Sequence, residues 1–99
     1  MTTDKYILDG HRPIIEKDLL TWGKWIETAD RKVARTEIGQ VKISTVFLGL
    51  DHQFGEGEPL LFETMVFGGK YDQEQERYST WDEAEKGHKK WVKKVEGKK

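Results

Sequence analysis

Apolar residues recur at helical spacing in two parts of the chain. In the first part, the repeat consists of Leu19, Trp22, Ile26 and Ala29. In the second part, it consists of Trp81, Ala84, His88, Trp91, Val92 and Val95. Intervals of three and four residues place each set on one side of an α-helix. Asp18 precedes the first set, and Ser79 and Thr80 precede the second, as is typical of residues that cap a helix N-terminus. The pattern therefore predicts two amphipathic helices.

Short runs rich in β-branched and aromatic residues predict strands elsewhere. These runs are residues 5–10, 31–37, 41–50 and 60–67, with a further short strand near Arg77 and Tyr78. Gly39 and Gln40 separate two of the runs and predict a hairpin. Residues 11–15 are expected to be extended, because Pro13 disfavours a helical conformation in the residue before it. The order β-α-β-β-β-α predicts an α+β fold, in which an antiparallel sheet of three to four strands carries both helices on one face.

The run "DHQFGEGEP" separates the two central strands and is long for a hairpin loop. If this loop is centred near Gly55, residues whose numbers sum to 110 face each other across the two strands. One face then holds Ser44, Val46, Leu48, Leu50, Leu60, Phe62, Thr64 and Val66. The other face holds Ile43, Thr45, Phe47, Leu61, Glu63, Met65 and Phe67. Both faces are largely apolar in this register, and a shift by one residue would exchange them but leave both apolar.

Two helices on one side of such a sheet leave its second face uncovered, so that face is expected to need a cover of its own. A second subunit, a ligand, or the N-terminal strand with residues 11–15 could supply it. Glu63 sharpens this expectation, because a carboxylate among apolar neighbours needs a partner. The candidate partners are Arg31, Arg35, Arg77 and the donors of an incoming ligand.

Length and composition bound the class of protein. The 99 residues are expected to form a single domain, 1–99, with a basic tail at 93–99 that frays. Lys and Arg (17) nearly balance Asp and Glu (18), so no global field favours an extended nucleic acid. Residues 89–99 carry six lysines and one glutamate, which fits either a solvated helix end or contact with a polyanion.

The compartment follows from what the chain lacks. There is no cysteine, which excludes disulfides and thiolate chemistry. No apolar run approaches the ~20 residues of a membrane span, and the N-terminus lacks the pattern of a signal peptide. We therefore expect a cytoplasmic protein that does not contact a membrane.

Familiar catalytic and cofactor motifs do not match the chain. The glycines of the acidic loop are not followed by the Lys-Ser/Thr of a phosphate loop. Asp51, His52, Glu56 and Glu58 lack a recognised metal-ligand spacing, so neither a metal nor a cofactor is expected. The hydroxyls of Ser44, Thr45 and Ser79 show no triad spacing with a histidine. No catalytic residue is therefore assigned, and a binding role is favoured over an enzymatic one.

Three segments carry a resemblance to a known family. They are "STVFLGLDHQFG", "LLFETMVFGG" and "ERYSTWDEAEKGH", within a similarity that covers residues 5–92. The chain resembles a family of small proteins encoded by tailed bacteriophages and prophages, for which no activity or site map is established. The resemblance implies a phage accessory protein that acts in the cytoplasm of a bacterial host.

Two functions fit this resemblance together with the residue pattern. The first is sequestration, without catalysis, of a small nucleotide-type immune signal, which makes the protein a counter-defence factor. The candidate ligand-binding residues are Glu63, Thr45, Phe47, Met65, Arg31, Arg35, Arg77, Tyr78 and His52. The second is a protein-binding module that docks on a host or phage protein through the apolar sheet face and the tryptophans. A nucleotide hydrolase is a weaker alternative, and a homo-oligomer is expected because a symmetric partner readily buries an apolar face.

Overall fold

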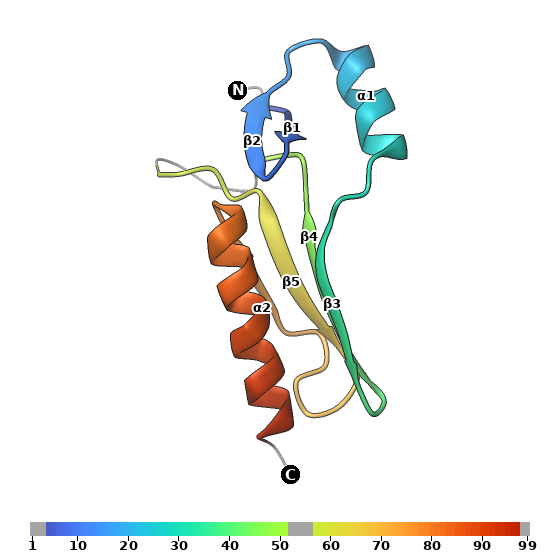
Figure 1. Ribbon diagram of the computed structural model, residues 1–99, viewed down its shortest axis with the longest axis vertical. Coiled ribbons are helices and arrows are strands. Elements are labelled where there is room, and N and C mark those ends of the chain that lie inside the picture. Colours follow the sequence, from blue (N-terminus) through green and yellow to red (C-terminus); the bar gives the residue numbers. More distant parts are fainter. Residues whose placement is uncertain (1–3, 52–56, 98–99) are drawn as a thin grey trace.

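The computed structural model describes residues 4–51 and 57–97 (Figure 1). The strands are β1 (Tyr6–Asp9), β2 (Arg12–Ile15), β3 (Lys32–Ile38), β4 (Val41–Phe47), β5 (Phe62–Phe67) and β6 (Gln75–Tyr78), and the helices are α1 (Leu19–Thr28) and α2 (Trp81–Glu96). Strands β3 to β6 form an antiparallel sheet in the order β3-β4-β5-β6, and β1 and β2 form a separate hairpin. The predicted α+β class with an antiparallel sheet is therefore confirmed, and residues 12–15 are not merely extended but paired with β1.

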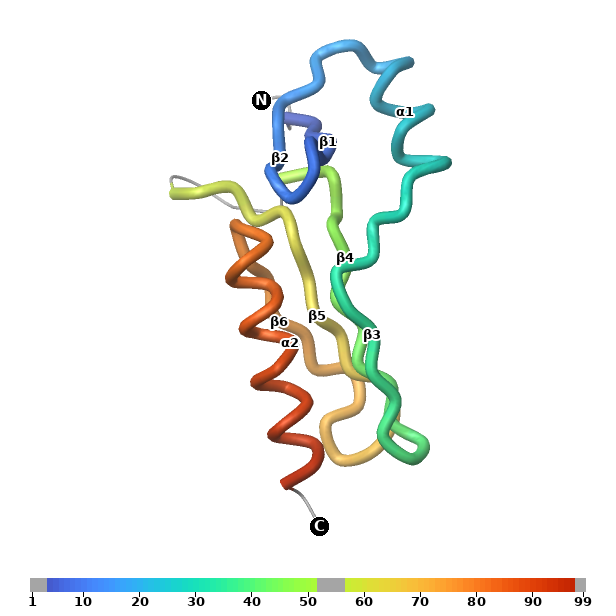
Figure 2. Tube along the Cα trace, in the orientation of Figure 1, coloured from blue at the N-terminus to red at the C-terminus, as the bar shows by residue number. Residues whose placement is uncertain are grey.

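Helix α2 lies along the four-stranded sheet and contacts all of its strands, whereas α1 stands beside β1 beyond one end of the sheet (Figures 1 and 2). This differs from the prediction that both helices share one sheet face. Trp22 of α1 explains the position, because its indole Nε1 donates to the carbonyls of Tyr6 and Gly49 at 3.1 and 3.3 Å. No residue of α1 is buried, and the helix reaches the core through Trp25, whose ring meets Phe47 edge-on.

Local side-chain contacts define where both helices begin. Asp18 Oδ1 accepts hydrogen bonds from the backbone amides of Leu20 and Thr21, at 3.0 and 3.4 Å. Thr80 and Glu83 form a complete capping box at the start of α2. Helix α2 then continues to Glu96, so the first lysines of the basic end are helical.

The pairing of β4 with β5 differs by one residue from the predicted register. Ile43 faces Val66 and Thr45 faces Thr64, so the numbers of paired residues sum to 109. The face toward α2 holds Ile43, Thr45, Phe47, Phe62, Thr64 and Val66, all of them buried. The open face holds Lys42, Ser44, Val46, Glu63, Met65 and Phe67. The prediction of two largely apolar faces was wrong, because a one-residue difference between the strands mixes the two predicted sets into one buried face and one mixed face.

Two apolar clusters fill the space between α2 and the sheet. One contains Phe47, Leu61, Phe62, Tyr78 and Ala84, and the other contains Ile43, Val66 and Trp91. On β4, β5 and α2, the buried polar residues Thr45, Thr64 and His88 come between members of the two clusters in the sequence of each element. The core therefore consists of two apolar layers with a polar layer between them.

Candidate functional site

The predicted ligand-binding residues do not come together in one place. Thr45, Phe47 and Tyr78 are buried under α2, whereas Glu63 and Met65 lie on the open face of the sheet. The predicted set grouped these residues because it rested on the wrong register. The structure therefore separates the proposed Glu63 pocket into a buried part and an open part.

The predicted arginines have separate partners. Arg31 Nη1 donates to the carbonyl of Phe47 at 3.3 Å, and Arg35 forms an exposed ion pair with Glu37 at 2.9 Å. Each therefore has a structural contact of its own. The predicted ligand residue His52 and the loop positions near Gly55 lie outside the described residues.

Glu63 finds its partner directly across the sheet. Arg77 of β6 faces it in register, and Arg77 Nε lies 3.0 Å from Glu63 Oε2. The side chain of Glu63 is 15% exposed and that of Arg77 is 32% exposed, so the pair is partly shielded from solvent. Of the three arginines that the sequence offered, Arg77 is the one that pairs with this carboxylate.

A chain of hydrogen bonds runs through the buried polar layer. His88 Nε2 lies 2.8 Å from Thr36 Oγ1, and His88 Nδ1 lies 2.7 Å from Thr45 Oγ1. Thr45 in turn is hydrogen-bonded to Thr64. Burial lowers the pKa of His88, so the imidazole is neutral at pH 7. This chain joins α2 to β3, β4 and β5 in a single layer.

The chain continues to a carboxylate at the other edge of the sheet. Tyr78 Oη lies 3.1 Å from both Thr64 Oγ1 and Glu76 Oε1. A carboxylate can only accept, so the phenolic proton points to Glu76, and the hydroxyl of Thr64 can donate to Tyr78. Burial raises the pKa of Tyr78 to about 12, which keeps this proton in place.

The ionised carboxylate of Glu76 is the last group in this chain of hydrogen bonds. Lys90 Nζ lies 2.8 Å from Glu76 Oε1, and Trp91 Nε1 donates to the same oxygen at 3.1 Å. Burial alone would raise the pKa of Glu76, but the hydrogen bonds from Lys90 and Trp91 outweigh it and lower that pKa. With the donors ordered toward this carboxylate, Thr45 accepts from His88, which places the imidazole proton on Nδ1.

Among the residues that the structure describes, no carboxylate is hydrogen-bonded to His88. A catalytic histidine is normally held by a third group that stabilises its protonated form, usually a carboxylate. The hydrogen-bond partners of His88 are two threonine hydroxyls, and the side chain is 4% exposed. The sequence pattern placed His88 in the apolar repeat of the second helix, and in the structure it is a buried residue that ties α2 to the sheet.

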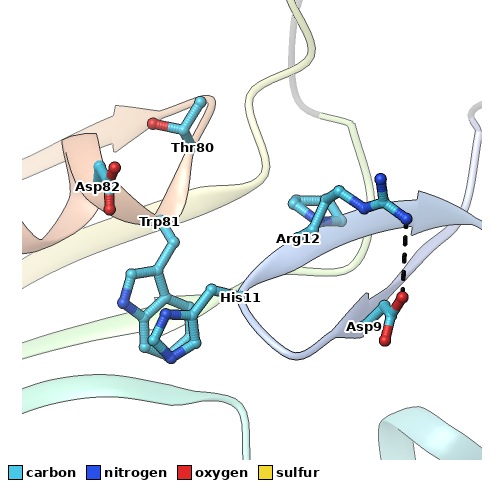
Figure 3. Close-up of a pocket in the computed structure, with 7 residues that line it drawn as sticks. Asp9, His11, Arg12, Thr80, Trp81 and Asp82 are labelled. Atoms are coloured by element: carbon cyan, nitrogen blue, oxygen red, sulfur yellow. Dashed lines mark ion pairs between the residues drawn. The ribbon is translucent and has the colours of Figure 1, made fainter.

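A cleft of about 350 Å³ lies between the β1–β2 hairpin and the start of α2 (Figure 3). It is lined by Asp9, His11, Arg12, Pro13, Thr80, Trp81 and Asp82. The imidazole of His11 stacks on the indole of Trp81, with ring centroids 3.8 Å apart and the planes 3° from parallel. Arg12 Nη2 lies 3.7 Å from Asp9 Oδ2, and both side chains are largely exposed. We call this site the hairpin cleft.

The indole of Trp81 carries an unusual polar atom. Its Nε1 is buried, and it has no hydrogen-bond partner among residues 4–51 and 57–97. A buried donor without a partner is rare in folded proteins. The indole ring of Trp81 also contacts the core, because it meets the ring of Phe62 edge-on with 6.2 Å between the ring centroids.

The sequence interpretation did not find the hairpin cleft. His11 and Trp81 are 70 positions apart, and each was assigned a local role, in an extended segment and in a helix stripe. The signal that could have pointed to them is the imidazole ring in the turn itself, because Gly10 and His11 are the turn residues between β1 and β2. Only the tertiary fold brings that turn to the first residue of α2.

A second hollow, of about 480 Å³, lies between α2 and the outer strand β3. Its lining consists of Thr36, His88, Lys89, Val92, Lys93 and Glu96.

Within the described ranges, no three His, Asp or Glu side chains cluster in a way that could hold a metal ion. Nor does any helix there have the length and apolar character needed to cross a membrane. Comparisons of the chain with protein-family models, with curated proteins and with solved structures find no match.

Proposed function

We propose that this protein is a non-catalytic binding protein that sequesters a small nucleotide-type ligand and holds its base in the hairpin cleft. The observation that carries the proposal is the parallel stack of His11 on Trp81 at 3.8 Å. This is the geometry that a nucleobase adopts on an aromatic side chain. The exposed imidazole at the hairpin tip occupies a position on the indole that a planar ligand can take.

The polar residues around the stack suit the remainder of a nucleotide. The carboxylates of Asp9 and Asp82 can accept hydrogen bonds from the amino group of a base, and Arg12 can pair with a phosphate. The pairing of Arg12 with Asp9 is long and exposed, so an incoming phosphate can replace it at little cost. Base stacking on one aromatic residue contributes about 1–3 kcal/mol.

The biological setting of the proposal comes from the resemblance to phage accessory proteins. A phage protein that binds a nucleotide tightly and releases it unchanged lowers the free concentration of that nucleotide in the host. An immune signal of this chemical class is therefore the ligand that we propose. Hydrolysis of the ligand is the competing outcome, and it is separated from binding by what is recovered afterwards.

The test is calorimetric titration with mononucleotides, cyclic nucleotides and cyclic dinucleotides, followed by heat denaturation and chromatography of the released ligand. We expect stoichiometric binding of one class and recovery of the intact compound. Trp81→Leu, which removes the stacking ring, should weaken binding about 5- to 150-fold, the equivalent of one stacking contact. His11→Ala vacates the position on the indole that the base takes and should not weaken binding. Lys24→Ala on the exposed face of α1 is the matched control and should bind like the original protein.

Two results would overturn the proposal. Recovery of altered nucleotide would make the protein a hydrolase. Absence of heat with every nucleotide class, from a protein that melts cooperatively, would remove the nucleotide function altogether.

A second candidate function, binding of a protein partner, is favoured by the hollow between β3 and α2. The sheet face that the sequence indicated for this role has Lys42, Glu63 and Arg77 on it and is not a surplus apolar surface. The expectation of a homo-oligomer rested on the same face, so the molecular mass in solution is a separate test of that expectation.

A further inference from the structure

The β3 strand is an outer strand of the sheet, and it borders a groove. In the described chain, β3 pairs with β4 alone, so one edge of its backbone faces away from the sheet. Beside that edge lies the hollow of about 480 Å³ whose other wall is α2. Thr36 lines it from the strand and Val92 from the helix. We call this site the edge groove. A groove between an edge strand and a helix is the geometry in which many domains take up an extended peptide as an added strand.

The hairpin register shows which backbone groups of β3 are available. Gly39 and Gln40 form a two-residue turn, so Ile38 and Val41 beside it are a hydrogen-bonded pair. Because such pairs alternate along an antiparallel ladder, Arg35 and Glu37 turn their backbone N–H and C=O groups outward. The irregularity in β3 lies between Lys32 and Ala34 and leaves the following residues regular.

The charges on the α2 wall indicate the chemistry of the occupant. Lys89 and Lys93 line the groove, and neither forms an ion pair with a residue that the structure describes. By contrast, Lys90 on the neighbouring side of α2 is paired with Glu76. One carboxylate, that of Glu96, also lines the groove at the last residue of the helix. The two lysines therefore give most of the groove a positive charge, which favours a negatively charged occupant.

The spacing of these lysines matches that of a strand. Lys89 and Lys93 are four residues apart, which is about 6 Å along a helix. Alternate residues of a strand point to the same side and are about 6.6–6.8 Å apart. Since α2 runs along the sheet (Figure 1), a strand added to β3 would direct every second side chain at the α2 wall. Acidic residues at alternate positions would then meet both lysines.

We propose that the edge groove binds an extended acidic segment of a partner protein, which adds to β3 as a fifth strand and pairs its alternate carboxylates with Lys89 and Lys93. A second copy of this chain fits the groove less well. Symmetric pairing of two β3 strands would bring two α2 helices side by side on the same sheet face, with Lys89 and Lys93 of both copies close together. Like charges so placed oppose association.

The test uses two fluorescein-labelled heptapeptides of the same composition and fluorescence anisotropy as the readout. In Thr-Glu-Thr-Glu-Thr-Val-Thr, both glutamates point to one side of a strand, whereas in Thr-Thr-Glu-Glu-Thr-Val-Thr they point to opposite sides. We expect saturable binding of the first peptide, at least tenfold tighter than binding of the second, and weaker as salt is raised.

Three variants of the full chain separate the two parts of the proposal. Lys89→Glu with Lys93→Glu should weaken binding of the alternating peptide at least tenfold, whereas Lys17→Glu with Lys24→Glu, the charge-matched control on exposed positions, should leave it within twofold. Arg35→Pro removes one outward N–H at an edge position where proline is tolerated, and it should weaken binding at least fivefold. Circular dichroism melting verifies that each variant folds.

The outcomes are decisive in both directions. Equal binding of the two peptides, or equal loss in the charge-reversed and control variants, overturns the proposal, as does the absence of saturable binding to the folded original protein. A dimer in light scattering that Arg35→Pro converts to a monomer would assign the edge to a second copy instead.

Discussion

The ring of Tyr78 lies against the backbone of Gly87, in the space that any side chain at position 87 would occupy. A Cβ built on Gly87 would collide with the ring carbons and the hydroxyl of Tyr78. Glycine inside a helix is about 1 kcal/mol less favourable than alanine, so local propensity does not explain its presence in the middle of α2. The close approach does explain it, because it lets Tyr78 pass under the helix and reach Thr64 and Glu76.

Gly87→Ala is expected to destabilise the protein in spite of the higher helix propensity of alanine. Overpacking of a filled core lowers the free energy of unfolding by about 1–3 kcal/mol, and displacement of Tyr78 would break its hydrogen bonds as well. Urea denaturation measures the change. Gly23→Ala is the matched control, because a Cβ there meets nothing within 4 Å. It should leave stability unchanged or raise it by about 0.5–1 kcal/mol. Equal effects of the two substitutions would contradict the role assigned to Gly87.

The stability of the fold is expected to fall as the pH falls below about 6.5. Burial lowers the pKa of His88 in the folded protein, whereas the unfolded chain titrates near the ordinary value of 6.5. The unfolded state therefore binds the proton first, and the free energy of unfolding decreases with falling pH until the folded histidine is protonated too. Neither hydrogen-bond partner of His88, Thr36 or Thr45, titrates in this range.

Urea denaturation at pH 7.5, 6.5 and 5.5 tests this dependence, and Glu76 stays ionised over that range because its pKa is lowered. His88→Gln removes the titrating group and should flatten the profile. A profile with the same slope in this variant would show that another group is responsible.

Thr45→Val is expected to destabilise the protein although the two side chains have the same shape. The substitution leaves Nδ1 of His88 without its hydrogen-bond partner inside the core, and it removes one of the two hydrogen bonds of the Thr64 hydroxyl. An unsatisfied buried polar group costs about 1–3 kcal/mol. Ser44→Ala, one position earlier on the open face, should change the free energy of unfolding by less than about 0.5 kcal/mol. A Thr45→Val protein as stable as the original would show that the polar layer contributes nothing.

The elements that the sequence predicted well are those defined by local contacts. Asp18 and Thr80 were expected to cap helices, and both do so through side chains within three residues of their partners. The turn at Gly39 and Gln40 was also expected, because a positive φ at the first central position of a two-residue hairpin favours glycine. In each case, the interaction that decides the structure lies within a few residues of the pattern that reveals it.

The register of β4 and β5 could not be predicted in the same way. The connection between these strands is long, so no tight turn determines which of their residues pair. Thr45 and Phe47 were therefore grouped with Glu63, which lies on the opposite face. The contact of His11 with Trp81 is equally non-local, since it depends on how the β1–β2 hairpin docks on α2.

Glu63 and Arg77 are expected to act as a modest structural ion pair that is independent of ligand binding. The two residues face each other across β5 and β6 with 3.0 Å between Nε and Oε2, and both remain partly exposed. Partly exposed pairs of this kind have coupling energies of about 0.2–1 kcal/mol. A double-mutant cycle with Glu63→Gln and Arg77→Gln, followed by urea denaturation, measures that coupling. The hairpin cleft contains neither residue, so nucleotide affinity should be unchanged in the Glu63→Gln protein. Loss of nucleotide binding with the fold retained would move the ligand site from the hairpin cleft to the open face of the sheet.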